Sequence, residues 1–302
     1  MPNPQLTASG LAYETLDLTP PWAKGGRPVV FHHGIGTNRQ IWTDWLPAVL
    51  TRHPILRFDT RGYGASAVPP VDHKWHLEAS LADLMEMVAL VGPGPVHLVG
   101  ESLGGTVVLM AAIRHPERVA SATVSNTAYR GAGIAEVGGW REAFARQGVE
   151  AWSREMMAKR FVPGALDEAR QAWFHSVQAK SPAHVTAGLG EMLAAADLGP
   201  ELHKLEAPLL ILMPDRSPFV TAPMGVELAR LVPHAELAMI PGTRHGLPFS
   251  HGAECGQRLA RHLDRVEAAR VLSSLRLEAG GLECGLPDPE LVLDVGRQLL
   301  GR

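Results

Sequence analysis

The chain has 302 residues, of which 46% are hydrophobic and 20% charged, and its formal net charge is −3. This composition is typical of a globular protein with a sizeable core, and it excludes a largely disordered chain. The small negative charge provides no general basic field for nucleic acid or an anionic membrane, and two cysteines, Cys255 and Cys284, are too few for a disulfide framework.

The first residues contain no basic segment followed by an apolar run, so we expect no signal peptide. Further along, no stretch approaches 18 uncharged apolar residues, and we therefore expect no membrane span. Because the low cysteine count also favours a reducing compartment, the sequence predicts a cytoplasmic protein.

Short apolar segments recur along the chain, with helical patterns between them. The sequence predicts strands at residues 28–32, 55–59, 96–100, 119–125, 208–213 and 235–240, and helices at residues 77–91 and 104–114. Alternation of strands with helices indicates a mostly parallel sheet that is covered on both faces. The predicted fold class is therefore α/β.

Residues 130–197 interrupt this alternation, because they show helical patterns rich in Trp, Phe and Met and no convincing strand. The segment is too long for a connecting loop, so we interpret it as a helical cap inserted between two strands. We accordingly divide the chain into a core, a cap and a C-terminal extension. The core comprises residues 1–129 and 198–265, the cap residues 130–197, and the extension residues 266–302.

The C-terminal extension continues a long helix predicted at residues 253–279, and a second helix is predicted to end near Leu300. The second helix has an N-cap and an N1 proline at Asp288 and Pro289. Its apolar stripe suggests a contact between two copies of the chain, so one interpretation is a homo-oligomer. The stripe consists of Leu291, Val292, Val295 and Leu299.

Residues 100–105 carry the strongest chemical signal, a serine between glycines that directly follows a predicted strand and precedes a helix. This G-x-S-x-G arrangement is the pattern of a nucleophile elbow, which raises the serine hydroxyl above the sheet edge. A glycine-rich turn with an incidental serine is the alternative, but the flanking strand and helix favour the elbow. Ser102 is therefore the predicted nucleophile.

Acyl transfer to a serine also requires donors for the developing oxyanion and a base for the hydroxyl proton. The residue after the nucleophile, Leu103, provides one backbone N–H, and by position Ile35 provides the other. His245 is the predicted base because it follows a predicted strand and a short loop. It also follows Ser102 in the chain order serine, acid, histidine.

At this point the chain resembles the α/β-hydrolase fold family, over roughly residues 10–265. The resemblance is carried by residues 33–36, 58–66, 100–105 and 241–245. Within that family the chain is most similar to the 3-oxoadipate enol-lactonase branch, through residues 59–70, 115–119 and 125–128. The resemblance implies the α/β-hydrolase fold, a small-molecule substrate and a serine hydrolase mechanism.

The acid of the expected catalytic triad departs from the family pattern. Family members usually place an aspartate before a proline in the loop after the strand that follows the cap, and here Ser217 stands at that position. We predict that Asp215, two residues earlier, is the acid instead. A Ser102–His245 dyad is the alternative, whereas Asn126, at another position used by relatives, lacks the required charge.

No cofactor and no metal are expected. The adjacent His32 and His33 point to opposite faces of a strand end, and Gly62 and Gly64 do not open a helix in a dinucleotide-binding unit. The predicted function is hydrolysis of an ester, lactone or enol-lactone of a small carboxylic compound through an acyl-enzyme.

Two other functions remain open, cleavage of a carbon–carbon bond in a ring-fission product and non-catalytic ligand binding. The first uses the same nucleophile, base and oxyanion donors, whereas the presence of Ser102 and His245 argues against the second. A carboxylate on the substrate would require a cation in the pocket. The candidates are Arg39, Arg130 and Arg244.

Overall fold

The computed structural model describes residues 4–134 and 137–279, with only the backbone described for residues 273–279. The chain divides into two compact units, Met1–Asp264 and Arg265–Arg302. The predicted cap and all of the predicted core except its last residue, Arg265, lie in the first. The apolar stripe predicted at residues 291–299 lies outside the described residues, and so does the contact between copies that it suggests.

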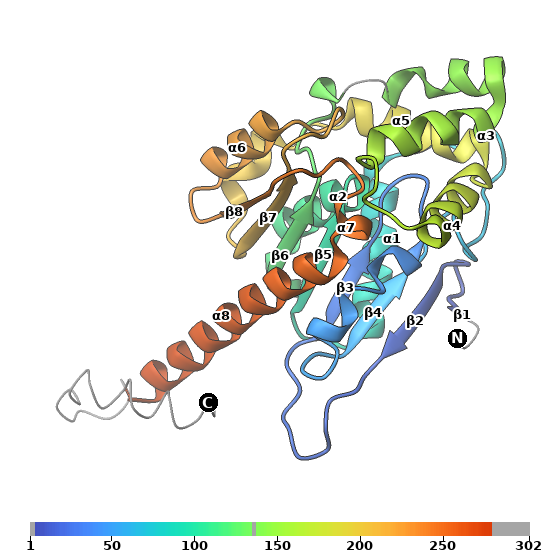
Figure 1. Ribbon diagram of the computed structural model, residues 1–302. Helices are drawn as coiled ribbons and strands as arrows, with labels where there is room; N and C mark the ends of the chain where they lie inside the picture. Colours follow the sequence, from blue (N-terminus) through green and yellow to red (C-terminus); the bar gives the residue numbers. More distant parts are fainter. Residues whose placement is uncertain (1–3, 135–136, 280–302) are drawn as a thin grey trace. The chain divides into compact units, whose positions relative to one another are not determined.

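The described part of the first unit contains an eight-stranded sheet with the strand order β1-β2-β4-β3-β5-β6-β7-β8 (Figure 1). The strands are β1 (Gln5–Leu6), β2 (Ala12–Leu16), β3 (Val29–His32), β4 (Ile55–Phe58), β5 (Val96–Glu101), β6 (Val119–Ser125), β7 (Leu209–Pro214) and β8 (Glu236–Ile240). All neighbouring pairs from β4 to β8 are parallel, whereas β1 and β2 are antiparallel. The predicted α/β class and the six predicted strands are thereby confirmed.

The two antiparallel strands at the edge were not predicted from the sequence. β2 carries a buried glutamate, Glu14, whose carboxylate forms an ion pair with Arg57 of the neighbouring β4. A charged residue on a buried face obscures the apolar alternation from which strands are recognised. The partner that makes this burial tolerable lies 43 positions away and is visible only in the folded chain.

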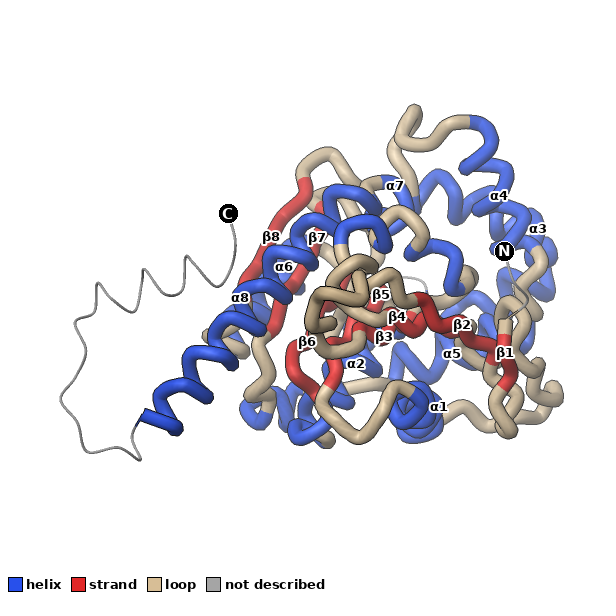
Figure 2. The backbone as a smooth tube through the Cα atoms, turned by 90° about the horizontal axis from the view of Figure 1, so that it is seen from below, coloured by secondary structure: helices blue, strands red, loops and turns tan. Residues whose placement is uncertain are grey.

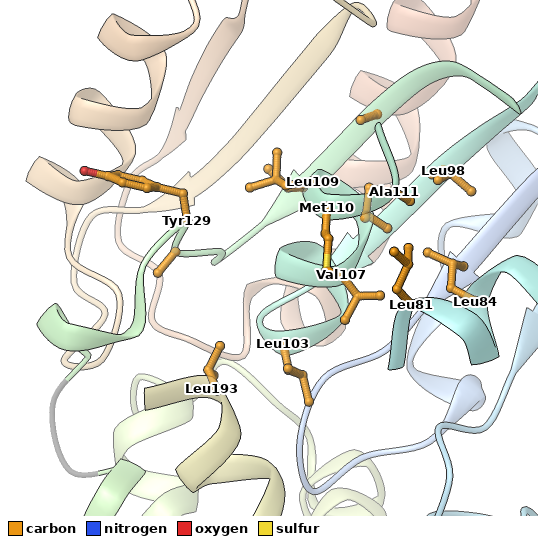
Figure 3. Packing of buried hydrophobic residues seen from close by; sticks show 14 of the residues in the cluster. Leu81, Leu84, Leu98, Leu103, Val107, Leu109, Met110, Ala111, Tyr129 and Leu193 are labelled. Atoms are coloured by element: carbon orange, nitrogen blue, oxygen red, sulfur yellow. The ribbon is translucent and has the colours of Figure 1, made fainter. Parts of the chain in front are cut away.

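The helices are α1 (Leu77–Leu90), α2 (Leu103–Arg114), α3 (Trp140–Arg160), α4 (Glu168–Ala179), α5 (Ala183–Ala195), α6 (Ala222–Leu231), α7 (Leu247–Ser250) and α8 (Gly252–Ala279). In Figure 2, α1 and α2 lie together on one side of the sheet. Figure 3 shows their apolar side chains packed against those of β5, with Leu81 and Leu84 on α1, Val107 and Met110 on α2, and Leu98 on β5. The helices predicted at residues 77–91, 104–114 and 253–279 agree with α1, α2 and α8 within one residue.

Side chains of the central strands alternate between two apolar layers, as a sheet covered on both faces requires. In β7, Ile211 packs in the layer that contains α1, α2 and α6, whereas its neighbour Leu212 packs in the opposite layer. That second layer includes Trp45 and Leu259, the latter from the beginning of α8. The sheet is therefore a rigid platform whose strand ends can hold side chains in fixed positions.

The segment between β6 and β7 contains α3, α4 and α5, which group together at one end of the sheet (Figure 1). Its two ends are joined by an isolated bridge between Arg130 and Asp197. Within this segment, the described residues between the two bridge partners form no strand. Residues 130–197, interpreted from the sequence as a cap, therefore contain the helices α3, α4 and α5.

Gly100 lies where β5 passes the first turn of α2. A Cβ atom placed on Gly100 would lie 2.5 Å from the carbonyl oxygen of Gly104 and 2.5 Å from the Cα atom of Gly105. Both are backbone atoms, which cannot rotate out of the way. The close approach of strand and helix therefore requires glycine at this position.

We expect Gly100→Ala to lower the free energy of unfolding by about 1–3 kcal/mol, because the added methyl group forces the strand and helix apart. Urea denaturation measures this change. Gly94→Ala is the matched control, since a Cβ at Gly94 would meet no atom within 4 Å. Equal losses of stability in the two variants would contradict the packing argument.

Candidate active site

Ser102 stands between β5 and α2 with φ 53° and ψ −119°, a left-handed conformation that is rare for a residue with a side chain. Its backbone N–H donates to the carbonyl of Ser125 at the end of β6. This is the strained strand–turn–helix geometry that the sequence motif predicts. Such a turn presents the hydroxyl at the edge of the sheet rather than in its interior.

His245 lies in the loop between β8 and α7, and its Nε2 atom is 3.3 Å from Oγ of Ser102. The imidazole is 4% exposed and packs edge-on against Phe219, with ring centroids 5.0 Å apart. Burial, and after it the positive charge of Arg160, hold the pKa of His245 well below its ordinary value. The ring is therefore neutral at neutral pH, as a base that accepts a hydroxyl proton must be.

The structure does not bring the predicted acid, Asp215, to the imidazole. The Asp215 carboxylate instead accepts the N–H of Thr243 at 3.0 Å, and the backbone N–H groups of Gly242 and Thr243 lower its pKa. The hydroxyl of Ser217 occupies the position facing His245, with Oγ 3.3 Å from Nδ1. The prediction that Asp215 is the acid partner of His245 is therefore wrong, because these backbone hydrogen bonds hold its carboxylate away from the imidazole.

Ser217 also accepts the backbone N–H groups of Phe219 and Val220, each at 3.3 Å. The loop therefore offers two donors to whatever side chain stands at this position. A hydroxyl can donate to Nδ1 or accept from it, so it does not fix the tautomer of His245 as a carboxylate does. It also brings no negative charge to the imidazole ring.

Asn126, the other position considered for the acid, forms a side-chain hydrogen bond with the backbone of His245. Its φ is 53°, and its Nδ2 donates to the carbonyl oxygen of His245 at 2.5 Å. The amide thus positions the loop that carries the imidazole without facing the ring nitrogens.

The loop after β3 carries Ile35, one of the two predicted oxyanion donors, and a buried histidine orients it. Nε2 of His33 accepts the N–H of Thr60 at 2.9 Å, so Nδ1 carries the proton and donates to the carbonyl of Gly34 at 2.7 Å. The Thr37 hydroxyl donates to the same carbonyl at 3.2 Å. Because that carbonyl is held, the N–H of Ile35 in the same peptide unit points the opposite way.

Leu103, the other predicted donor, is the first residue of α2, so its N–H has no acceptor within the helix. Ile35 and Ser102 line the same cavity. The two predicted donors and the serine are therefore grouped at one site.

Two further ionisable groups at this site were not singled out in the sequence. Glu101, between Gly100 and Ser102, accepts the N–H of Gly34 through Oε2 at 2.7 Å, and its Oε1 is 3.9 Å from Nε2 of His245. Burial raises the pKa of Glu101 to about 7, while Arg160 and the Gly34 N–H act in the opposite direction.

Arg160 is the last residue of α3 and 4% exposed, and its Nη2 donates to the carbonyl of Ile35 at 2.9 Å. Its Nε atom is buried without a hydrogen-bond partner. The cap and the loop after β3 are thus joined directly by this guanidinium.

A cavity lies in front of Ser102 and His245, and the cap supplies half of its lining. Among the described residues that line it, Arg160 carries a charge, and the others besides Ser102 and His245 are apolar. The apolar residues are Ile35, Ile134, Val137, Trp140, Leu193, Phe219 and Val220.

The three arginines proposed from the sequence as pocket cations are engaged elsewhere. Arg39 pairs with Asp59 at 2.5 Å, Arg130 with Glu227 at 3.3 Å, and Arg244 donates to a backbone carbonyl. Arg160, not any of these three, is the cation that faces the cavity.

Within the part of the chain that the structure describes, no three His, Cys, Asp or Glu side chains are grouped to hold a metal ion. Burial lowers the pKa of His32 and of His33 to about 4, so both rings are neutral. None of the described helices has the length and apolar character needed to cross a membrane.

Comparison with known proteins gives the relatives of this chain. The family model of the alpha/beta hydrolase fold matches residues 27–252. The 3-oxoadipate enol-lactonase 2 of Acinetobacter baylyi is 25% identical over 245 residues, which are 77% of this chain and 90% of that protein. A pimeloyl-[acyl-carrier protein] methyl ester esterase of Methylococcus capsulatus is 33% identical over 227 residues, covering 68% of this chain and 82% of the esterase.

Among solved structures, the enol-lactonase from Burkholderia xenovorans LB400 matches with a TM-score of 0.76 and 23% identity, over 84% of this chain and 96% of that one. A thermophilic esterase from Thermogutta terrifontis matches with a TM-score of 0.73 and 22% identity, over 87% and 98% of the two chains. The fold class and the resemblance inferred from the sequence motifs are both confirmed.

Proposed function

The chain belongs to the α/β-hydrolase fold family, and from that premise we propose that it hydrolyses an ester, lactone or enol-lactone of a small carboxylic compound. The observation that carries the proposal is the 3.3 Å approach of Ser102 Oγ to a buried, neutral His245 beside a largely apolar cavity. An enol-lactonase and a methyl ester esterase among the relatives support the same reaction class.

In the proposed mechanism, Ser102 Oγ attacks the carbonyl carbon of the substrate while its proton passes to Nε2 of His245. The backbone N–H groups of Ile35 and Leu103 hold the resulting oxyanion. His245 then returns the proton to the leaving alcohol or enol oxygen, and an acyl-enzyme forms on Ser102. A water molecule, deprotonated by His245, releases the acid product through the same steps.

The cavity in front of Ser102 is closed in by residues of both the core and the cap, which suits a small substrate. Its apolar lining excludes bulk water and thereby strengthens the interaction between the oxyanion and its N–H donors. The cap residues Trp140 and Leu193 belong to this lining, so the cap takes part in substrate selection in the proposed reaction.

We also propose that the substrate carries a carboxylate that binds Arg160. A guanidinium has five N–H donors, and that of Arg160 is held by one backbone carbonyl and leaves its buried Nε–H without a partner. An anionic group in the cavity would satisfy those donors and offset the buried positive charge. Among the described residues of a largely apolar lining, this cation is the feature that distinguishes charged from neutral substrates.

Turnover of a panel of p-nitrophenyl esters, small lactones, enol-lactones and ring-fission dienones tests the reaction class. We expect esters or lactones to be hydrolysed, and Ser102→Ala to lower kcat/KM by about 10⁴-fold or more, as loss of a serine nucleophile does. Turnover of the dienones alone would instead identify a carbon–carbon bond hydrolase. Activity retained by Ser102→Ala would exclude the proposed mechanism.

The role of Arg160 is tested by comparing a p-nitrophenyl monoester of a dicarboxylic acid with a neutral p-nitrophenyl ester of equal length. We expect Arg160→Gln to reduce the preference for the anionic ester, measured as a ratio of kcat/KM values, by about 10-fold or more. Arg244→Gln is the control, because Arg244 donates to a carbonyl outside the cavity. An unchanged ratio in Arg160→Gln would show that the carboxylate binds elsewhere or is not required.

A further inference from the structure

The base of the proposed mechanism lacks the partner that a triad normally supplies. When His245 accepts the Ser102 proton it becomes a buried cation, and in this family a carboxylate at Nδ1 ordinarily stabilises it. Here Nδ1 faces the neutral hydroxyl of Ser217, while Asp215 is bound to the loop backbone. Burial and Arg160 both disfavour the imidazolium, as the lowered pKa of His245 shows. Some other group must offset this cost.

The carboxylate that does approach the imidazole is that of Glu101. Its Oε1 lies 3.9 Å from Nε2, the same nitrogen that faces Ser102 Oγ, and both side chains are at most 4% exposed. Its position is fixed from the other side, because Oε2 accepts the N–H of Gly34 at 2.7 Å. Charges at this separation in an apolar surrounding interact much more strongly than at the surface.

We propose that Glu101 supplies the negative charge that the acid position lacks, stabilising the imidazolium of His245 from its Nε2 side. Glu101 acts as a positioning and charge-compensating residue, not as nucleophile or base. Through Gly34 it also holds the peptide that precedes the Ile35 N–H, so one carboxylate serves both the base and the oxyanion loop. The inference rests on the proposed Ser102–His245 chemistry.

Few charged or titratable groups surround Glu101, so a step in the pH profile can be assigned to its protonation. Arg160 from α3 and His245 from the loop after β8 are the ionisable partners. Two other buried titratable residues lie nearby, one in the loop after β3 and one close to Arg160. His33, with a pKa of about 4, and Tyr63, with a pKa raised by burial to about 12, are both neutral near pH 7. Among these groups, titration near neutrality therefore belongs to Glu101, because burial holds the pKa of His245 well below its ordinary value.

The decisive experiment compares Glu101→Gln with the double variant Glu101→Gln/Ser217→Asp on one ester substrate. Glutamine keeps an oxygen acceptor for the Gly34 N–H but removes the charge, so we expect kcat to fall about 10- to 100-fold with little change in KM. Aspartate at position 217 would face Nδ1 and the two N–H donors of that loop. We expect it to restore most of the lost kcat, which loss of a merely structural contact would not allow.

The pH profile provides a second readout that does not depend on the double variant folding. Burial raises the pKa of Glu101 to about 7, so the carboxylate is charged above that pH and neutral below it. Wild-type kcat should therefore decline as the pH falls through about 7. In Glu101→Gln this step near pH 7 should be absent, because the pKa of His245 is held well below its ordinary value.

Asp215→Asn is the matched control, since it removes a carboxylate from the same loop as Ser217 that does not face the imidazole. Its kcat should fall less than about tenfold, and its pH profile should match that of the wild type. Wild-type kcat and an unchanged pH step in Glu101→Gln would overturn the inference, as would a folded double variant no faster than the single one. If Ser102→Ala instead retains activity, the proposed function itself fails, and the two failures are thereby distinguished.

Discussion

The close approach of strand β5 to helix α2 is the constraint on which the site depends. There is no room for a side chain at Gly100, Gly104 or Gly105. A Cβ on Gly104 would meet the backbone of β3, and a Cβ on Gly105 would meet Thr127. In this packing Ser102 has a positive φ, and the loop after β3 lies beside it. The Ser102 hydroxyl and the N–H of Ile35 therefore lie at the same edge of the sheet.

Three buried ionisable side chains then give this edge its chemistry, and each comes from a different part of the chain. Glu101 belongs to the core strand, Arg160 to the cap and His245 to the loop after β8. Glu101 accepts the N–H of Gly34 and Arg160 donates to the carbonyl of Ile35, so the loop after β3 is held from both the core and the cap. Movement of the cap would consequently change both the cavity and the position of Ile35, the proposed oxyanion donor.

The site residues that could be predicted from the sequence are those whose position depends on the backbone conformation of a turn. Ser102 and Ile35 lie in turns that need glycine nearby, and such turns leave a pattern in the sequence. Glu101 occupies the position between Gly100 and Ser102 where the motif accepts any residue, and the sequence does not show that its side chain turns inward. Whether Arg160 or its neighbour Lys159 faces the cavity depends on how α3 packs, which no local pattern fixes.

The acid position illustrates the same limit. Asp215 and Ser217 are two residues apart in one loop, and the choice between them depends on which backbone N–H groups each meets. Those donors come from Phe219 and Val220 on one side and from Thr243, 28 positions away, on the other. The edge strand β2 was missed for a related reason, since the burial of Glu14 is explained only by Arg57 on another strand.

The central claim is that Ser102 is a nucleophile activated by His245. It is tested most directly by treating the protein with an activated alkyl phosphonate and locating the adduct by peptide mass spectrometry. We predict a single stoichiometric adduct on Ser102, formed at a rate that falls at least about 10³-fold in His245→Gln. Labelling of a different residue, or an unchanged rate of labelling in His245→Gln, would contradict this account.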